Sequence, residues 1–297
     1  LRGAGDTWTP FNAMVAVNLV NAPTSYLLAV QCDMGVEGIA YGTLLGWLAG
    51  VVMILWKLYP RETTKSLIVL KKKWLKWNRD ISRRILKVGL PQLVEVLGMW
   101  SIHAYGIKLI ASVGDKDDGL IGSHGLAVLV ESLSFMPGFA LGTAAATLAG
   151  QYIGAGSKDM AMKAVQACWR VAICVMGGMG IILFFGAEGL INIISPGSEE
   201  YAQRAASLVM IVAIAQPFFA TAMVMKMSMR GAGATGTVML YSYGTMLIFR
   251  VALLTIMVKS FGADLKMIWD SMTLMIMVQG VVFLIVRVRW KWMTAEV

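Results

Sequence analysis

A few ionisable side chains interrupt otherwise apolar stretches of this 297-residue chain. Glu95 and Glu131 lie well inside such stretches, and Lys226 and Arg250 are the opposing charges. A charged side chain near the centre of a membrane helix costs roughly 2.5–3.5 kcal/mol, so each one that is kept indicates a function. A glutamate that binds H⁺ or Na⁺ loses its charge, which changes the cost of facing either side of a membrane. An ion-coupled exporter needs such a switch.

Glu95 is the first candidate for ion coupling. The residues Gln92, Glu95, Met99, Ile102 and Gly106 recur at three- and four-residue steps. In a helix this spacing puts them on one stripe, which we expect to face a cavity. The alternative interpretation is a glutamate that pairs structurally with a neighbouring helix.

Glu131 is the second candidate. Pro137 and Gly138 follow it, and a helix weakened there can turn carbonyl groups toward a cation or bend between states. Structural pairing is the alternative here too. We expect Arg250 to pair with a carboxylate, and Glu131 and Asp270 are both possible partners.

His103 and His124 fall on adjacent apolar stretches, both toward the outer half. Histidine titrates near neutrality and can relay protons, but the interpretation that we favour for this pair is hydrogen-bonded packing. A metal site built from these histidines with Glu95 and Glu131 would resemble an intramembrane hydrolase, yet no HExxH spacing supports it. No Walker pattern for direct ATP use is present either. We therefore expect a protein that is not an enzyme and has no cofactor.

Methionine and aromatic side chains are abundant, with 22 Met and 10 Trp. Flexible, polarizable methionine suits a cavity that repacks around dissimilar ligands, and aromatic faces attract organic cations. Both residue types are also ordinary in lipid-facing positions. The candidates for a substrate cavity are Gln92, Met99, Trp100, His103, His124, Met136, Phe139, Gln216, Phe218 and Phe219.

The composition sets the class of protein. Hydrophobic residues make up 58%, charged residues 14%, and the mean hydropathy is +0.69, which excludes both a water-soluble globule and a disordered chain. Three scattered cysteines encode neither a disulfide framework nor a zinc cluster. Since a spanning helix needs about 20 apolar residues, we predict an all-α polytopic membrane protein with eight transmembrane helices. The predicted spans are 9–31, 36–57, 86–113, 121–149, 160–185, 201–229, 234–260 and 264–288.

The net charge of +9 is confined to alternate connections between these spans. Lysine and arginine concentrate on one side, which predicts that both ends of the chain face the cytoplasm and that nucleic acid is not a partner. Between the second and third spans, apolar residues recur at helical steps among basic ones. This segment, 58–85, is predicted to be an amphipathic helix that contacts membrane lipid at the cytoplasmic interface.

One short motif occurs twice. Leu1-Arg2-Gly3-Ala4-Gly5-Asp6-Thr7 recurs as Met229-Arg230-Gly231-Ala232-Gly233-Ala234-Thr235, and each copy precedes two predicted spans. We interpret each copy as a helix end terminated by glycine, with its arginine at the interface. Repeats of matching orientation indicate two bundles related by an axis along the membrane normal.

With these motifs the chain resembles the multidrug and toxic compound extrusion (MATE) transporters. The two Arg-Gly-Ala-Gly copies match the segment after the fourth helix of each MATE lobe. Residues 134–156 look like the family's signature across a helix end and the following loop, and Gly150, Gln151, Gly154 and Gly156 there fit close backbone approach and a tight turn. Weaker matches are Gly89-Leu90-Pro91, Gln216-Pro217-Phe218, Gly35-Val36-Glu37-Gly38 and Trp269-Asp270.

The resemblance implies a twelve-helix transporter in two lobes that exports cationic or amphipathic compounds by alternating access. On that map, residues 1–57 are the last two helices of the N-lobe, 58–85 the linker, 86–290 a complete six-helix C-lobe and 291–297 a cytoplasmic tail. Four helices would then precede Leu1, and we expect no transport by this piece alone. The resemblance also places the protein in the bacterial inner membrane, as a monomer.

The resemblance also bears on the coupling ion. Sodium-driven members carry an aspartate in the sixth span where this chain has Pro217, Phe218 and Phe219. The expected coupling ion is therefore H⁺ in preference to Na⁺. The alternatives are a flippase for lipid-linked precursors, which would want a markedly cationic cavity, and a passive channel, which buried carboxylates and repeats do not favour.

Overall fold

The apolar stretches of this chain become long helices. The computed structural model describes residues 1–59, 77–113, 119–195 and 199–289. Within these described residues, seven helices are long and apolar enough to cross a membrane, or eight if the bent pair Tyr201–Ala213 and Gln216–Gly231 counts as one span. A helix satisfies its backbone hydrogen bonds internally, which is what a membrane-spanning segment requires. The prediction of an all-α polytopic protein is confirmed.

The chain divides into two compact units, Leu1–Arg79 and Asp80–Val297. Unit 1 contains the 3₁₀ turn η1 (Arg2–Ala4), α1 (Trp8–Tyr26), the π-helical η2 (Leu27–Gln31) and α2 (Gly35–Leu58). Unit 2 contains α3 (Arg79–Ala111), α4 (Leu120–Gly154), α5 (Lys158–Ile194), α6 (Glu199–Ala213), α7 (Gln216–Gly231), α8 (Thr235–Met246), the π-helical η4 (Leu247–Leu253), α9 (Leu254–Phe261) and α10 (Leu265–Arg289).

Unit 1 is a helical hairpin that packs through small residues. Gly38, Gly42, Gly46 and Gly50 are the buried residues of α2, one on each turn. A Cβ atom at Gly38 would lie 2.5 Å from the backbone nitrogen of Ala29, so the two helices are in backbone contact. Small residues at four-residue spacing allow this close approach in membranes, where helix association depends on packing.

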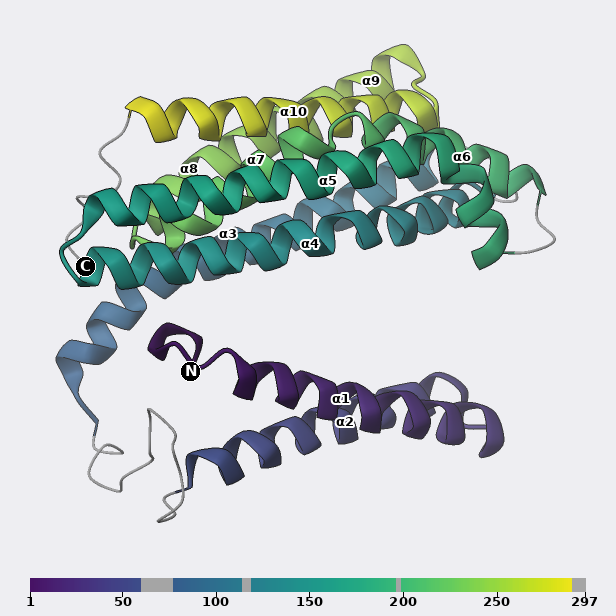
Figure 1. The fold of residues 1–297 in the computed structure, drawn as a ribbon. Coiled ribbons are helices and arrows are strands. Elements are labelled where there is room, and N and C mark those ends of the chain that lie inside the picture. The colour runs from purple at the N-terminus through teal and green to yellow at the C-terminus, as the bar shows by residue number, and fades with distance from the viewer. Residues whose placement is uncertain (60–76, 114–118, 196–198, 290–297) are drawn as a thin grey trace. The chain divides into compact units, whose positions relative to one another are not determined.

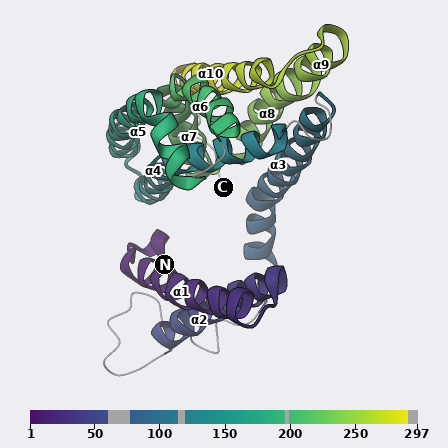
Figure 2. The same cartoon turned by 90° about the vertical axis from the view of Figure 1, so that its right-hand side faces the viewer.

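The centre of unit 2 is also built from small residues. In Figure 1 and Figure 2, α4, α5 and α7 run side by side, and the most extensive contacts in the unit are those of α4 with α5 and with α7. Ala145, Ala172 and Ala220 are completely buried where the three helices meet. The core continues in both directions along α4, with Leu183, Leu208 and other apolar side chains at one end and Met225 and Phe283 at the other.

Several predicted boundaries differ from the structure, and α5, for example, continues to Ile194 instead of ending at residue 185. The sixth predicted span, 201–229, is not a continuous helix, because α6 and α7 meet at a bend of 59° around Ile214 and Ala215. The helix that forms the third span begins at Arg79 rather than at residue 86, so Ile81 belongs to α3. Residues 60–76 of the predicted amphipathic linker lie outside the described residues.

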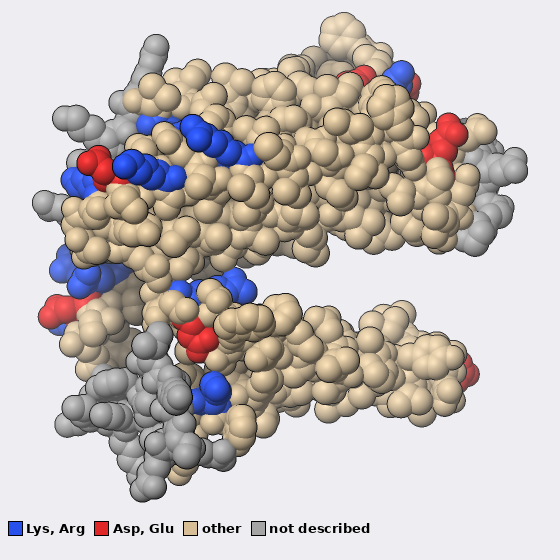
Figure 3. Space-filling model, viewed as in Figure 1, with Lys and Arg blue, Asp and Glu red and all other residues tan. Residues whose placement is uncertain are grey.

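Charge is distributed unevenly along unit 2. Most of its lysine and arginine side chains that Figure 3 shows lie toward the end at which α5 begins, while acidic side chains are more frequent at the opposite end. The long apolar surface between them includes large exposed side chains such as Phe185 and Ile193. Such a surface suits contact with lipid tails and is the pattern expected of a membrane-spanning bundle.

Candidate functional site

An ion pair connects α3 to α7 inside unit 2. Arg230, at the end of α7, donates from Nη2 to Oε1 of Glu95 on α3 at 2.7 Å. The Glu95 side chain is only 8% exposed and that of Arg230 is 22% exposed. Glu95 is therefore a buried carboxylate whose charge is balanced by an arginine that lies 135 residues further along the chain.

The pairing leaves hydrogen-bonding capacity unused on both side chains. Oε2 of Glu95 and Nε of Arg230 are buried and have no hydrogen-bond partner in the described part of the chain. An arginine and a carboxylate can form two parallel hydrogen bonds, and this pair forms only one. The carboxylate is thus held by a single contact, and its second oxygen is available to another donor or cation.

Lys226 adds a second positive charge close to this pair. It lies one turn before Arg230 on α7 and interacts electrostatically with both Arg230 and Glu95. Its Nζ donates to Oε1 of Gln279 at 3.5 Å and lies 5.8 Å from the centre of the Phe283 ring. The cluster formed by Glu95, Lys226 and Arg230 therefore contains two cations and one carboxylate.

Tyrosines hold α3 at two further points. Tyr243 of α8 donates to the carbonyl oxygen of Val94 at 2.5 Å, and its ring lies directly over Gly98. Tyr105 and Thr255 share a hydrogen bond of 2.8 Å nearer the other end of the helix. Among the described residues, no other helix backbone lies as close to α3 as those of α4, α5 and α7 lie to one another. Side chains, more than backbone packing, hold α3 in place.

The second predicted carboxylate belongs to a separate cluster. Glu131 on α4 interacts electrostatically with Arg250, which lies in the π-helical segment η4. Of the two partners considered for Arg250, the interaction is with Glu131, and Asp270 is exposed on α10. Each carboxylate predicted from the sequence thus has an arginine near it, in an ion pair for the buried Glu95 and through a longer-range interaction for the half-buried Glu131. π-Helical segments often occur at functional sites.

The two histidines lie beside Arg250. His103, His124 and Arg250 line a cavity of about 10 Å³, together with Gly106, Ile107, Ile110, Leu254 and Met272. Trp269 donates from Nε1 to Nδ1 of His124 at 3.1 Å. Since the indole nitrogen is only a donor, His124 is held with Nδ1 unprotonated, and protonation of that atom would break the bond. His124 therefore has a defined packing role.

Most predicted cavity residues do not gather in one place within unit 2. Gln92, Met99 and Trp100 lie on the exposed side of α3, and Met136, Phe139 and Phe218 are also exposed. Phe219 packs against Phe135 with ring centres 6.2 Å apart. Gln216 is different, because it is completely buried and neither of its amide atoms has a partner among the described residues. It lies at the first residue of α7, beside the bend.

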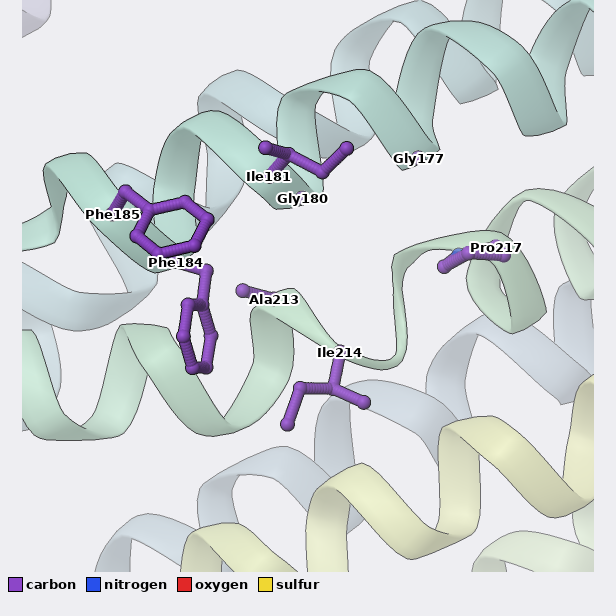
Figure 4. Close-up of a pocket in the computed structure, with 8 residues that line it drawn as sticks. All are labelled: Gly177, Gly180, Ile181, Phe184, Phe185, Ala213, Ile214 and Pro217. Carbon is purple, nitrogen blue, oxygen red and sulfur yellow. The ribbon is translucent and has the colours of Figure 1, made fainter.

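The bend between α6 and α7 also creates a hollow that the sequence reasoning missed. Figure 4 shows Phe184 and Phe185 of α5 on one side of it and Pro217 of α7 on the other. The hollow has a volume of about 430 Å³, and its lining is completed by Gly177, Gly180, Ile181, Ala213 and Ile214. A Cβ at Gly180 would lie 2.7 Å from the carbonyl oxygen of Ala213, so this glycine admits the broken helix. The signal in the sequence was Pro217 inside an apolar run.

The two motif copies have the same backbone structure. Gly5 and Gly233 have φ angles of 86° and 84°, and each donates its N–H to the carbonyl of the motif arginine, Arg2 or Arg230, at 3.0 Å. The next residue also makes the same bond in both copies, from Asp6 to Leu1 at 3.1 Å and from Ala234 to Met229 at 2.9 Å. Glycine adopts this left-handed conformation without strain, so both copies are glycine-terminated helical turns.

The second copy is packed against the signature segment of α4. A Cβ at Gly231 would lie 2.2 Å from the carbonyl oxygen of Ala146, and one at Gly150 would lie 3.1 Å from the carbonyl oxygen of Gly231. Gly156 has a φ of 76° in the turn after α4, whereas Gly154 has no neighbour within 4 Å of an added Cβ. Two motifs that are distant in sequence thus meet at one backbone contact, one residue from Arg230.

Comparisons with known proteins agree on one family. A family model described as MatE matches residues 91–258, more than half of the chain. A probable multidrug resistance protein NorM from Thermotoga maritima is 29% identical over 98% of this chain and 62% of its own length. A probable multidrug resistance protein YoeA from Bacillus subtilis is 25% identical over 78% of this chain and 50% of its length. The chain spans about half to three-fifths of these relatives.

Solved structures show the same fold. A crystal structure of MATE in complex with MaD3S superposes with a TM-score of 0.86 at 19% identity, covering 97% of this chain and 63% of that one. A crystal structure of MATE in complex with MaL6 superposes with a TM-score of 0.84 at 18% identity, covering 94% of this chain and 62% of that one. At these identities the likeness concerns the fold alone.

Proposed function

This chain belongs to the MatE family of membrane transporters, and we propose that the protein exports organic cations or amphipathic drugs in exchange for protons. Glu95 is the residue that couples the entry of protons to the export of substrate. The observation that carries this proposal is the buried carboxylate of Glu95, which has one removable counter-charge and one oxygen without a partner among the described residues. A carboxylate of this kind exchanges a proton for a cationic group because both neutralise the same charge.

The charges around Glu95 support H⁺ over Na⁺ as the coupling ion. Arg230 contacts the carboxylate and Lys226 interacts with it electrostatically. Protonation and sodium binding both cancel the negative charge of Glu95, but sodium also needs further oxygen ligands, and the neighbours of this carboxylate are the cations Arg230 and Lys226. The absence of an aspartate around Pro217 agrees with this choice.

Glu131 is the second proposed coupling residue, and Arg250 is the positive charge that acts on it, without the direct ion pair that Glu95 forms. For the architecture, we propose that residues 1–57 complete one lobe, that 58–85 link it to a six-helix lobe at 86–290, and that 291–297 form a tail. The charge distribution of unit 2 supports a cytoplasmic location for the C-terminal end of the chain, and we propose the same location for the N-terminal end. The protein would act as a monomer in the plasma membrane, surrounded by lipid.

The comparisons do not favour the flippase that the sequence left open, since the relatives are named as multidrug resistance proteins. Substrate contact by the methionine and aromatic side chains remains a proposal. Met99 and Trp100 on α3 are the best placed of them, because they share the helix that carries Glu95.

The test uses the complete gene product in liposomes. Accumulation of the fluorescent organic cation rhodamine 6G is followed under an imposed pH gradient and, separately, under a sodium gradient. We expect accumulation with the pH gradient alone and its loss in Glu95→Gln. Glu188→Gln, which alters an exposed glutamate on α5, is the matched control and should behave as the wild type. No accumulation under either gradient would contradict the proposed function, and equal loss in both variants would contradict the role of Glu95.

A further inference from the structure

Arg230 forms an ion pair in addition to the helical turn that it shares with Arg2, the corresponding arginine of the first motif copy. Both motif arginines supply a backbone carbonyl to a glycine-terminated turn, but Arg2 is exposed and makes no ion pair within the described residues, whereas Arg230 pairs with Glu95. The turn therefore forms without an ion pair. The structure of the motif therefore does not account for the ion pair that the side chain of Arg230 forms with Glu95.

We propose that Arg230 is a tethered competitor for Glu95, which occupies the carboxylate when neither the coupling proton nor a cationic substrate is bound. The inference rests on the proposed function and adds a third participant to the exchange. A carboxylate carries one negative charge, so a guanidinium, an organic ammonium group and a proton compete for it. Arg230 thereby sets how tightly the other two bind.

The geometry of the ion pair allows Arg230 to leave Glu95. The contact is a single hydrogen bond of 2.7 Å, and Nε of Arg230 and Oε2 of Glu95 make none with other described residues. Lys226 stands one turn away on the same helix, and its ammonium group lies beside the neutral groups of Gln279 and Phe283. Because Lys226 also interacts electrostatically with Glu95, the carboxylate keeps part of its charge compensation when Arg230 is released.

The movement would be confined to side chains at α7. Gly231, the next residue, lies against the carbonyl oxygen of Ala146 so closely that the backbone of α7 has no room to shift toward α4. Arg230 must therefore leave by rotation of its side chain. When the side chain of Arg230 leaves, α3 would lose its ion pair to α7 and keep the hydrogen bonds of Tyr243 and Tyr105. Substrate binding would then loosen α3 from α7.

The charged and titratable groups that face Glu95 come from two helices. Arg230 and Lys226 come from α7, and the phenol of Tyr243, from α8, binds the carbonyl of the residue before Glu95. Two graded variants follow from this environment. Arg230→Gln removes the competitor, and Lys226→Gln removes a nearby charge without touching the ion pair. Arg2→Gln is the matched control in the other motif copy.

The experiment measures binding of rhodamine 6G to the complete gene product in detergent at pH 8, by fluorescence anisotropy. We expect Arg230→Gln to bind the dye about tenfold more tightly, which corresponds to ~1.4 kcal/mol. Lys226→Gln should bind it about threefold more tightly, and Arg2→Gln should match the wild type. Unchanged or weaker binding by a folded Arg230→Gln protein would overturn the proposal.

A second readout does not depend on the dye. The melting temperature of each protein is recorded at neutral pH. Removing Arg230 leaves the carboxylate of Glu95 buried without its counter-charge, so Arg230→Gln should melt at a lower temperature than the wild type, and adding Glu95→Gln should recover part of that loss. If the wild type neither binds nor transports the dye, the proposed function fails, and the melting curves still decide the role of Arg230. An Arg230→Gln protein that melts at the same temperature as the wild type would overturn the proposal.

Discussion

The two copies of the Arg-Gly-Ala-Gly motif share a backbone and differ in what surrounds it. In unit 1 the copy at Leu1–Thr7 has an exposed arginine, and an added Cβ at Gly3 would meet nothing within 4 Å. In unit 2 the corresponding glycine, Gly231, is in backbone contact with α4, and the arginine reaches a buried carboxylate on α3. The same turn is a simple helix end in one place and the meeting point of three helices in the other.

The backbone turn that the two copies share is therefore separate from the ion pair for which we propose a function. The glycine in the left-handed conformation appears in both copies because the turn requires it. Within the described residues, only the arginine of the second copy forms an ion pair, and its partner is Glu95. The proposed coupling chemistry of unit 2 is thus built on a structural element that unit 1 uses without it.

The largest effect is expected at the backbone contact that only the second copy makes. Gly231→Leu would place a side chain against the carbonyl oxygen of Ala146, and neither backbone can yield easily. We expect a loss of about 4 kcal/mol, above the usual ~1–3 kcal/mol for overpacking, because the clash is with backbone. The melting temperature and yield of purified protein measure it. Gly3→Leu is the control, and a comparable loss there would contradict the asymmetry.

The next effect concerns the ion pair. Arg230→Gln leaves Glu95 buried without its counter-charge and should lower the free energy of unfolding by about 3 kcal/mol at neutral pH. Combining it with Glu95→Gln should recover a large part of that loss, since no buried charge is then left unpaired. Melting curves of the two single variants and the double variant give the coupling energy. Strictly additive losses would show that the two side chains do not interact.

A smaller effect should be equal in both copies. Gly5→Ala and Gly233→Ala each force a residue with a Cβ into a left-handed conformation, which costs about 1 kcal/mol. We expect faster hydrogen exchange at the amides of Asp6 and Ala234, whose bonds close the two turns. If protection from exchange were lost in one copy and kept in the other, the two turns would differ in stability although their backbone geometry is the same.

The smallest effect is specific to the first copy. Asp6 accepts a hydrogen bond from the backbone N–H of Thr9 at 2.9 Å, and the bonds from the hydroxyl and amide of Thr9 hold the pKa of Asp6 below its ordinary value. A lowered folded-state pKa gives stability that is present above the unfolded-state pKa and lost as the pH falls through the folded-state value. We therefore expect the protection factor of the Thr9 amide, its exchange rate relative to that of an unstructured peptide at the same pH, to fall in acid, and Asp6→Asn to weaken that dependence. The second copy has Ala234 at this position and should show no such change.

The general fold could be predicted from the sequence, because long apolar runs leave few alternatives in a membrane. The two carboxylates could be found as well, since Glu95 and Glu131 stand out in their apolar surroundings. Their partners could not be assigned, because Arg230 and Arg250 reach them through tertiary packing that sequence spacing does not encode. The role of Arg230 was predicted as an interfacial anchor, and its contact with Glu95 is a finding of the structure.

Two other features were missed for different reasons. The bend before Gln216 depends on how α5 packs, since Gly180 makes room for the broken backbone, and Pro217 alone also fits an unbroken helix start. The glycine stripe of α2, Gly38 to Gly50, was visible in the sequence as a four-residue repeat and predicts the close packing of the hairpin. The expected polar-to-small stripe on α3 is only partly buried, because Gln92 and Met99 are exposed.

The most direct test of the account is the number of protons released when an organic cation binds. Rhodamine 6G is added to the complete gene product in weakly buffered detergent solution, and a pH indicator records the release. The account predicts release by the wild type and none by Glu95→Gln, because proton and substrate compete for that carboxylate. Equal release by both proteins would contradict it, since the proton would then come from another group.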